Sequence, residues 1–213
     1  MEREDALDAL VERAIARDHE AFGALYDLYF ERIFRYVLLK VGEPAEAEDL
    51  AATVFLNAWR GIGHFVSRGP GSFGAWLFRL AHNALVDRYR HLREAAPLDE
   101  VDERDLPNDA RDDPASVLDW RLTVEELRAA LATLTEEQRE VVLLRFVGEL
   151  SAREVGEHMG KQEGTVRGLQ FRAIDALRRA LVQSSGAREN RAQSNPLWTG
   201  AAQGKARRTH DRA

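Results

Sequence analysis

Two short helical stretches joined at a glycine, between Ser151 and Leu181, restrict the fold more than any other part of this 213-residue chain. Ser151 can cap the first stretch, and Glu154, three residues later, completes a capping box. Gly160 suits the left-handed conformation that ends such a helix. Apolar residues then recur at the three- and four-residue steps of a longer second helix. This spacing predicts a helix-turn-helix; the alternative is an ordinary helical hairpin with a solvated charged face.

The second of these helices has the composition of a nucleic-acid contact. Arg167 and Arg172 lie mostly off its apolar stripe, and the N-terminus of a helix presents free N–H groups to phosphates. The formal net charge of the chain is −6, so no global field attracts it to DNA. Any affinity for nucleic acid therefore has to come from local basic patches of this kind.

Composition argues against several other classes of protein. The chain has no cysteine, which excludes a disulfide scaffold, a thiolate metal site and a cysteine nucleophile. Its six histidines show no metal-binding spacing and its glycines form no nucleotide-binding loop, so no catalytic residue, metal or cofactor is expected. Glu136, Glu137 and Glu140 cluster where a helix begins, and the helix dipole accounts for them. No apolar run approaches the roughly 20 residues that span a bilayer, so we expect a cytoplasmic chain without membrane insertion.

Helical periodicity extends over most of the chain, and no segment shows the period-two alternation of a strand. The stretch from Glu94 to Pro114 is rich in acidic residues and proline, and it has too few large apolar groups to repay the entropy of ordering. The sequence after Gln183 is similarly polar. We therefore predict an all-α chain of two small helical domains joined by a flexible acidic linker, the second domain containing the helix-turn-helix. The predicted parts are a first domain (7–93), the linker (94–116), a second domain (117–183) and a disordered tail (184–213).

The last helix of the first domain, from Phe73 to about His91, mixes aromatic and basic side chains. Single-stranded DNA requires both, because unpaired bases stack on flat rings while cations neutralise the backbone. The alternative is that the aromatic residues are mainly core, which we adopt for Trp76 and Leu80. The candidate DNA ligands on this helix are Arg79, Asn83 and Arg88.

Three stretches resemble the bacterial extracytoplasmic-function (ECF) sigma factors: Ala45–Arg60 (AEAEDLAATVFLNAWR), Phe73–Arg90 (FGAWLFRLAHNALVDRYR) and Leu134–Ala173. They occur in the family's order, and the resemblance extends from about Leu7 to Leu181. It implies a specificity subunit that binds core RNA polymerase and directs it to promoters, reading −35 and −10 elements and helping to melt the DNA. Catalysis would then belong to the polymerase. A stand-alone helix-turn-helix regulator is the alternative, although it leaves the first domain unexplained.

The resemblance also implies where the polymerase would dock, on the helix from Ala47 to Arg60. An acidic helix start stabilised by the dipole is the alternative for this helix. Ala52 and Thr53 stand where the family often has Gln-Glu. The implied polymerase contacts are Glu48, Asp49, Thr53 and Asn57.

Promoter DNA would be read by both domains. Asn83 falls where the family's ARN motif places an asparagine that reads a −10 base, and the Gly-rich loop before this helix would hold a flipped base. Gly168 and Leu169 replace polar residues of many members, so the preferred −35 sequence is expected to differ. An anti-sigma factor is a further candidate partner. The implied −10 contacts are Ser67, Arg68, Arg79, Asn83 and Arg88. The implied −35 contacts are Arg145, Thr165, Arg167, Phe171 and Arg172.

Overall fold

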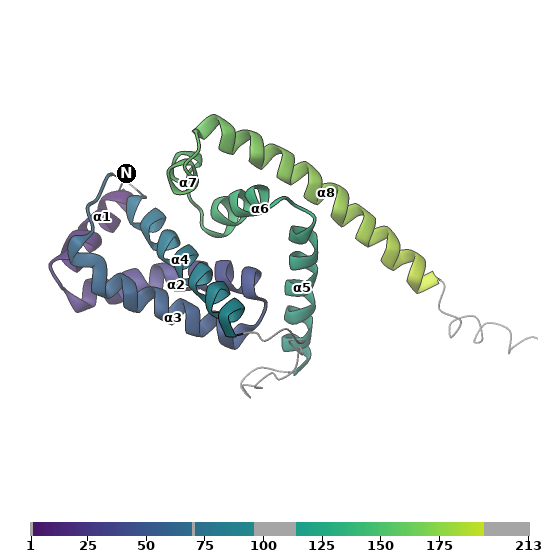
Figure 1. Cartoon of the computed structure of the whole chain (residues 1–213), viewed down its shortest axis with the longest axis horizontal. Helices are drawn as coiled ribbons and strands as arrows, with labels where there is room; N and C mark the ends of the chain where they lie inside the picture. Colours follow the sequence, from purple (N-terminus) through teal and green to yellow (C-terminus); the bar gives the residue numbers. More distant parts are fainter. Residues whose placement is uncertain (1, 70, 96–113, 194–213) are drawn as a thin grey trace, which may run out of the picture.

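The computed structural model describes residues 2–69, 71–95 and 114–193, and within these ranges it contains helices and no strand (Figure 1). The predicted all-α class is therefore confirmed. None of the described helices is long and apolar enough to cross a bilayer. The elements are α1 (Glu2–Ile15), α2 (His19–Val41), α3 (Pro44–Gly61), the 3-10 turn η1 (Ile62–His64), α4 (Ser72–Ala95), α5 (Pro114–Ala132), α6 (Glu136–Val142), the π-helical turn η2 (Leu143–Val147), α7 (Ala152–Met159) and α8 (Glu163–Gln193).

Local sequence signals set the helix boundaries of the first domain. Asp18 caps α2, and its carboxylate accepts hydrogen bonds from two N–H groups of the first turn, at 2.9 and 3.1 Å. Gly42 ends α2 with a φ of 90°, a conformation that disfavours any side chain, and Pro44 occupies the first turn of α3. The helical periodicity does not predict the break before α2, where Arg17 adopts a φ of 68°.

The core of the first domain lies where α2 crosses α3 and α4. Leu25, Ile33 and Tyr36 of α2 are fully buried, as are Val54 of α3 and Phe78 of α4. Burying each large apolar side chain stabilises the fold by roughly 1.5–3 kcal/mol. The periodic apolar stripe that predicts these helices is therefore also the set of contacts that holds them together.

Capping boxes begin the short helices of the second domain. Thr135 and Gln138 exchange hydrogen bonds at the start of α6, and Ser151 and Glu154 do so at the start of α7. Gly160 then ends α7 in the left-handed conformation, with a φ of 65°, and α8 begins after a short joint. The predicted helix-turn-helix is confirmed.

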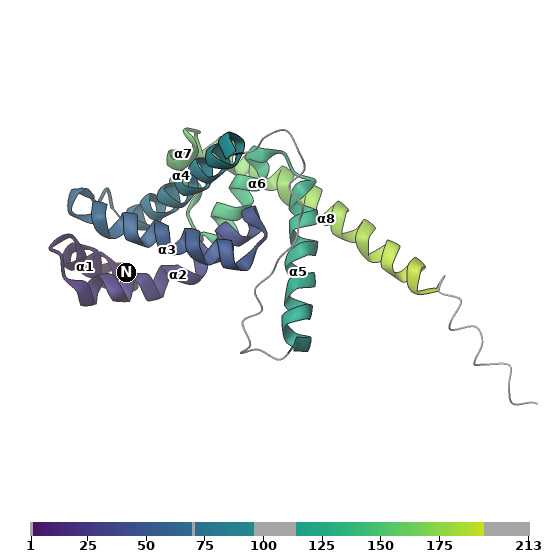
Figure 2. The ribbon, with the colours of Figure 1, turned by 60° about the horizontal axis from the view of Figure 1, so that its bottom comes forward.

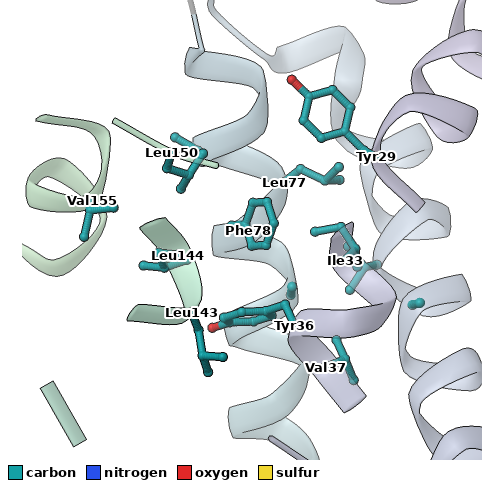
Figure 3. Packing of buried hydrophobic residues seen from close by; sticks show 14 of the residues in the cluster. Tyr29, Ile33, Tyr36, Val37, Leu77, Phe78, Leu143, Leu144, Leu150 and Val155 are labelled. Atoms are coloured by element: carbon teal, nitrogen blue, oxygen red, sulfur yellow. The ribbon is translucent and has the colours of Figure 1, made fainter. Parts of the chain in front are cut away.

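The two domains share one continuous apolar core (Figure 3). Tyr36 of α2 and Phe78 of α4 lie beside Leu143 and Leu144 of η2, and all four side chains are buried. α4 also runs alongside α7, as Figure 2 illustrates. Two helical domains on a tether are predicted from the sequence, but their packing against one another is not.

The predicted linker and tail lie largely outside the described residues. Only the ends of the linker (94–116) are described: α4 runs to Ala95 and α5 begins at Pro114. α8 continues to Gln193, past the predicted start of a disordered tail at Ser184. Helix extension adds one hydrogen bond for each further residue, and this segment contains the good helix formers Ala, Arg, Gln and Glu. Residues 194–213, the rest of the predicted tail, are outside the described ranges.

Candidate functional site

The first half of α8 has one exposed and one buried side, as expected for the second helix of the motif. Phe171 is 76% exposed, a conspicuous position for a large apolar ring. The opposite side packs into the core through smaller apolar residues. The exposed predicted residues are Thr165, Arg167, Phe171 and Arg172, and the buried ones are Val166, Leu169 and Ala173.

The two arginines of this exposed side make contacts within α8. Arg167 pairs with Glu163 one turn earlier, at 2.5 Å. Arg172 donates from Nε to the carbonyl oxygen of Gly168, at 3.2 Å. An exposed ion pair of this spacing contributes only about 0.3–0.5 kcal/mol, so a phosphate can displace Glu163 from Arg167 at little cost.

Arg145, a predicted −35 contact, has an internal role in the structure. Its guanidinium donates to the side-chain oxygen of Gln170 at 3.1 Å and to the carbonyl oxygen of Leu150. These bonds fasten η2 to α8 and to the segment before α7. Arg145 therefore helps to orient α8 relative to the rest of the second domain.

α4 buries most of the aromatic residues that made it a candidate for stacking on bases. Phe73 and Phe78 are 3% and 0% exposed, which removes both from any stacking role. Trp76 and Leu80 are partly buried against the same core, as predicted. The predicted DNA ligands that remain exposed on α4 are Arg79 and Asn83.

Arg88, the third candidate on α4, is held by Glu46 of α3. Its Nε and Nη2 groups both donate to the carboxylate, Nε to Oε1 and Nη2 to Oε2, the latter at 2.6 Å. The hydrogen bond to Glu46 raises the pKa of this guanidinium, so the charge is permanent. A bidentate pair of this kind fixes the angle between α3 and α4.

The loop before α4 folds back on Ser72. The Ser72 hydroxyl lies 3.3 Å from that of Ser67 and accepts a hydrogen bond from the N–H of Arg68 at 3.2 Å. Gly69 and Gly71 have φ values of 110° and 79°, which only glycine adopts readily. The turn leaves the side chains of Ser67 and Arg68 exposed.

The side of α3 that faces away from the core carries the predicted polymerase contacts. Leu56 lies at the centre of this side and is 49% exposed, although no residue in the predicted set is apolar. Its position out of phase with the buried stripe is the sequence signal that could have identified it. The four predicted residues, all exposed, are Glu48, Asp49, Thr53 and Asn57.

A buried carboxylate lies at the junction of the two domains. Glu140 of α6 is 7% exposed; it accepts a hydrogen bond from the Tyr36 hydroxyl at 2.7 Å and pairs with Lys40. Nδ1 of His82 and Nε2 of His158 approach the same Oε1 atom, at 3.8 and 3.5 Å. The helix dipole is therefore not the main partner of Glu140, contrary to the prediction. No local pattern joins these five residues, because four different helices supply them.

The electrostatics of this cluster favour an ionised Glu140 and a neutral His82. Burial alone would raise the pKa of Glu140, but contact with His158, the charge of Lys40 and hydrogen bonds from Lys40 and Tyr36 lower it to about 2. Burial lowers the pKa of His82, against the opposing effect of Glu140. At neutral pH the carboxylate is therefore ionised, and the His82 ring favours its neutral form.

A cavity of about 750 Å³ adjoins this cluster, and its walls come from both domains. Lys40 and His82 line it from α2 and α4. The second domain contributes residues of α5 and α6, among them Arg128, Glu136 and Arg139. The junction between the domains is thus partly open beside the buried carboxylate.

Comparison with known proteins identifies the two domains. A family model described as Sigma-70 region 2 matches residues 25–94, and one described as Sigma-70, region 4 matches residues 130–179. The ECF RNA polymerase sigma factor SigK of Mycobacterium tuberculosis is 31% identical over 180 residues, which cover 82% of this chain and 93% of SigK. The chain belongs to the ECF RNA polymerase sigma factors.

Other members of the family are also similar to this sigma factor. The ECF sigma factor BldN of Streptomyces coelicolor is 40% identical over 172 residues, which cover 81% of this chain but only 64% of BldN. The ECF sigma factor SigW of Bacillus subtilis is 30% identical over 179 residues, covering 77% of this chain and 90% of SigW.

Solved structures share the fold. CnrH, solved in complex with the cytosolic domain of CnrY, has a TM-score of 0.58 and 23% identity, with 83% of this chain and 96% of that chain covered. RpoE of Bartonella quintana, solved with the anti-sigma factor NepR, has a TM-score of 0.53 and 20% identity. The match covers 75% of this chain and 96% of that chain. On this chain, region 2 extends from α2 to α4 and region 4 from the end of α5 into α8.

Proposed function

We propose that this ECF sigma factor binds core RNA polymerase, directs it to promoters through −35 and −10 elements, and helps to melt the DNA for initiation. It would act in the cytoplasm as a specificity subunit, while the polymerase supplies the catalysis. The observation that carries the proposal is the division of α8: the residues proposed to read DNA are exposed, and its apolar residues hold the helix in a domain that matches Sigma-70, region 4.

For the −35 element, α8 would enter the major groove. Arg167 and Arg172 can each fork onto the two acceptors of a guanine or onto a phosphate, since only weak local contacts hold them. Phe171 offers an apolar surface to a thymine methyl group, and Thr165 a hydroxyl near the helix start. Arg145 would act indirectly by holding α8 in position.

For the −10 element, we assign base reading to Asn83 and backbone contacts to Arg79, both exposed on α4. Ser67 and Arg68 would contact a flipped base from the loop before this helix, where glycines allow close approach of the chain. Arg88 is better suited to positioning α4 through Glu46 than to contacting DNA.

The polymerase would bind the exposed side of α3. Glu48, Asp49, Thr53 and Asn57 surround Leu56 on this side, which combines an apolar centre with a polar rim. Interfaces between proteins commonly have this anatomy. An anti-sigma factor is a further proposed partner, by analogy with RpoE of Bartonella quintana, which was solved with NepR.

The packed arrangement of the domains has to open for this function. The −35 and −10 elements are about 25 base pairs apart, roughly 85 Å along the duplex at 3.4 Å per base pair. A domain of this size has a radius of gyration of about 12 Å, so two of them packed together span less than that distance. Opening would break the contacts of Glu140 with α2, including the hydrogen bond from Tyr36.

Run-off transcription with purified core polymerase tests the proposed function. We expect transcripts of defined length from genomic promoter fragments only when the sigma factor and the core enzyme are both present. The stand-alone regulator makes the opposite prediction: tight binding of the promoter duplex without polymerase, and no effect on transcript yield by the core enzyme. That result would exclude the sigma-factor function.

Asn83→Ala tests the assignment of −10 reading to α4. Losing one good base contact is expected to reduce discrimination at a single −10 position by about 1–3 kcal/mol. Transcription from a library of −10 variants measures this effect, with Arg79→Ala as the matched control on the same helix. Arg79→Ala is expected to lower yield across all sequences, so the same uniform loss for Asn83→Ala would contradict the assignment.

A further inference from the structure

We propose that His82, Glu140 and His158 form a binding site for a divalent cation of the zinc class, and that the bound ion ties the two domains together. One ligand atom from each residue lies within 4.8 Å of the other two. His82 belongs to α4 in the first domain, whereas Glu140 and His158 belong to α6 and α7 in the second. The site therefore exists only while the domains are packed together.

The donor set suits zinc. Two imidazole nitrogens and one carboxylate oxygen are ligands that Zn²⁺ accepts, and three protein ligands leave a fourth position for water. Ligand atoms at about 2.0–2.2 Å from a tetrahedral ion lie roughly 3.3–3.6 Å apart. Glu140 Oε1 is 3.5 Å from His158 Nε2 and 3.8 Å from His82 Nδ1, and all three ligand atoms lie within 4.8 Å of one another, so contraction by up to about 1.5 Å completes the geometry.

The two imidazoles have no better partner in the described part of the chain. Both of their distances to Glu140 exceed the 2.7–3.2 Å of an ordinary hydrogen bond. Nδ1 of His82 is buried without a hydrogen-bond partner among the described residues. Such atoms are rare in folded proteins, and this one lies 3.8 Å from the carboxylate oxygen. A cation between the three residues would take up its lone pair.

The neighbours of Glu140 support the geometry of the cation site and also limit its affinity for the ion. A carboxylate offers about four lone-pair positions, so Tyr36 on Oε1 and Lys40 on Oε2 leave room for an ion at Oε1. Both bonds fix the orientation of the carboxylate, as partners of metal ligands commonly do. The ammonium of Lys40 repels a second cation, so the affinity is expected to be lower than that of a thiolate zinc site.

A route for the ion to enter is present. His82 is 43% exposed at its side chain and lines the cavity between the domains. His158 is only 5% exposed, so it forms the closed end of the site. A bound cation would stabilise the packed form by binding to it alone. This inference does not depend on the proposed function, because cation binding is measured on the isolated protein.

Metal titration of the purified, tag-free, EDTA-treated full-length protein tests the site. We expect one equivalent of Zn²⁺ by isothermal titration calorimetry, and an absorption spectrum of nitrogen- and oxygen-ligated Co²⁺ when cobalt replaces zinc. His82→Gln and His158→Gln should each weaken binding by at least roughly 10–100-fold, the loss reported for residues that only support a ligand. His64→Gln is the matched control, since His64 is exposed on η1 and is not one of the three residues of the cluster.

Labelling of the chain tests the link between the domains. The sequence has no cysteine, so Ala52→Cys on α3 and Arg178→Cys on α8 introduce unique exposed sites for a fluorescent pair. Zinc should narrow the distribution of distances between the two labels and shift it towards the distance of the packed form. The same labels in the His82→Gln, His158→Gln double variant should not respond to zinc.

Three results would overturn the proposal: no stoichiometric uptake by the wild-type chain, equal affinity in the histidine variants, or loss of binding in His64→Gln alone. Circular dichroism and thermal unfolding of each variant establish that it folds. A histidine variant that fails to fold is replaced by the corresponding Asn variant. Zinc uptake without any change in the distance distribution would refute the tie between the domains.

Discussion

α4 and α8 both carry basic and aromatic side chains and both are assigned to DNA, but they use those side chains differently. On α8 the aromatic ring of Phe171 and the guanidinium of Arg172 point to solvent, and the contacts of Arg172 are within the helix. On α4 the ring of Phe78 is buried, Arg88 is bound to α3, and His82 faces the second domain.

The difference follows from where each helix lies. α4 packs against α2 and α3 of the first domain and also against α7 of the second. The first half of α8 packs on α6 and α7 along one side only. The candidate DNA ligands of α8 are therefore separate from its stabilising residues. On α4, by contrast, Phe78 and Arg88 are held in the packing and only Arg79 and Asn83 remain exposed, and the predictions below test this contrast.

The largest effect is expected from two matched phenylalanine variants. Phe78→Ala removes a ring with no exposed surface and should lower the free energy of unfolding by about 3–5 kcal/mol. Phe171→Ala removes a ring that is 76% exposed and should change it by less than about 0.5 kcal/mol. Urea denaturation followed by circular dichroism measures both. Similar losses in the two variants would show that α8 is packed as tightly as α4, against the contrast drawn above.

Acid should lower the free energy of unfolding by acting on the junction between the domains, and this effect should be smaller than that of Phe78→Ala. The folded pKa of Glu140 is about 2 and its ordinary value is 4.5, so its ionised form stabilises the fold fully above about pH 5. This contribution, roughly 3 kcal/mol from the pKa difference, is lost as the pH falls from 5 towards 2. The lowered pKa of His82 acts in the same direction, since its protonation as the pH falls through about 6.5 also favours unfolding.

Unfolding free energies between pH 7 and pH 3 measure this dependence, with Glu140→Gln as the control. The variant keeps the shape of the side chain and removes the titrating carboxyl, so its stability should be lower at pH 7 and fall less with acid. A wild-type curve that runs parallel to that of Glu140→Gln would mean that this carboxylate does not titrate as the structure requires.

Sequence patterns predicted the elements of the fold because their signals are local. Ser151, Glu154 and Gly160 specify the start and end of α7 within ten positions of one another, and the structure has all three as expected. The exposed side of α8 followed from helical phase alone. The break at Arg17 was not predicted, because a single left-handed residue leaves the apolar periodicity on either side intact.

Contacts between the domains could not be predicted in this way. Tyr36 and Glu140 are 104 positions apart, and nothing in the sequence near either residue indicates the other. The histidine spacing gave no sign of a metal site for the same reason, since His82 and His158 meet only after the domains pack. The sequence also left open whether the aromatic residues of α4, such as Phe73 and Phe78, stack on bases or lie in the core, because stacking and core packing favour the same residue types, and the structure buries both.

Arg88→Ala is expected to have an intermediate effect on stability. The side chains of Arg88 and Glu46 are 19% and 34% exposed, so their bidentate pair should be worth about 1 kcal/mol, above the median for surface pairs. Arg79→Ala, on the same helix but exposed, should change stability by less than about 0.5 kcal/mol. Thermal unfolding of both variants measures the difference. If Arg79→Ala were the more destabilising, Arg88 would not be the residue that couples α4 to α3.

The smallest effect on stability, and the clearest on DNA binding, is expected for Arg172→Ala. Arg172 makes one weak bond to its own helix, so its loss should leave the free energy of unfolding unchanged within about 0.5 kcal/mol. If it contacts a phosphate, binding of the polymerase holoenzyme to a promoter with a −35 element should depend less steeply on salt, by roughly one unit in the log–log slope. If it contacts a guanine instead, the slope should change little and one −35 position should lose about 1–3 kcal/mol of discrimination.

Leu169→Ala is the matched control three residues earlier: Leu169 is 6% exposed, so truncation should cost about 2–5 kcal/mol of stability through a cavity. An Arg172→Ala variant that unfolds more readily than Leu169→Ala would place the charged side of α8 inside the domain, and the separation of recognition from stability on this helix would be wrong.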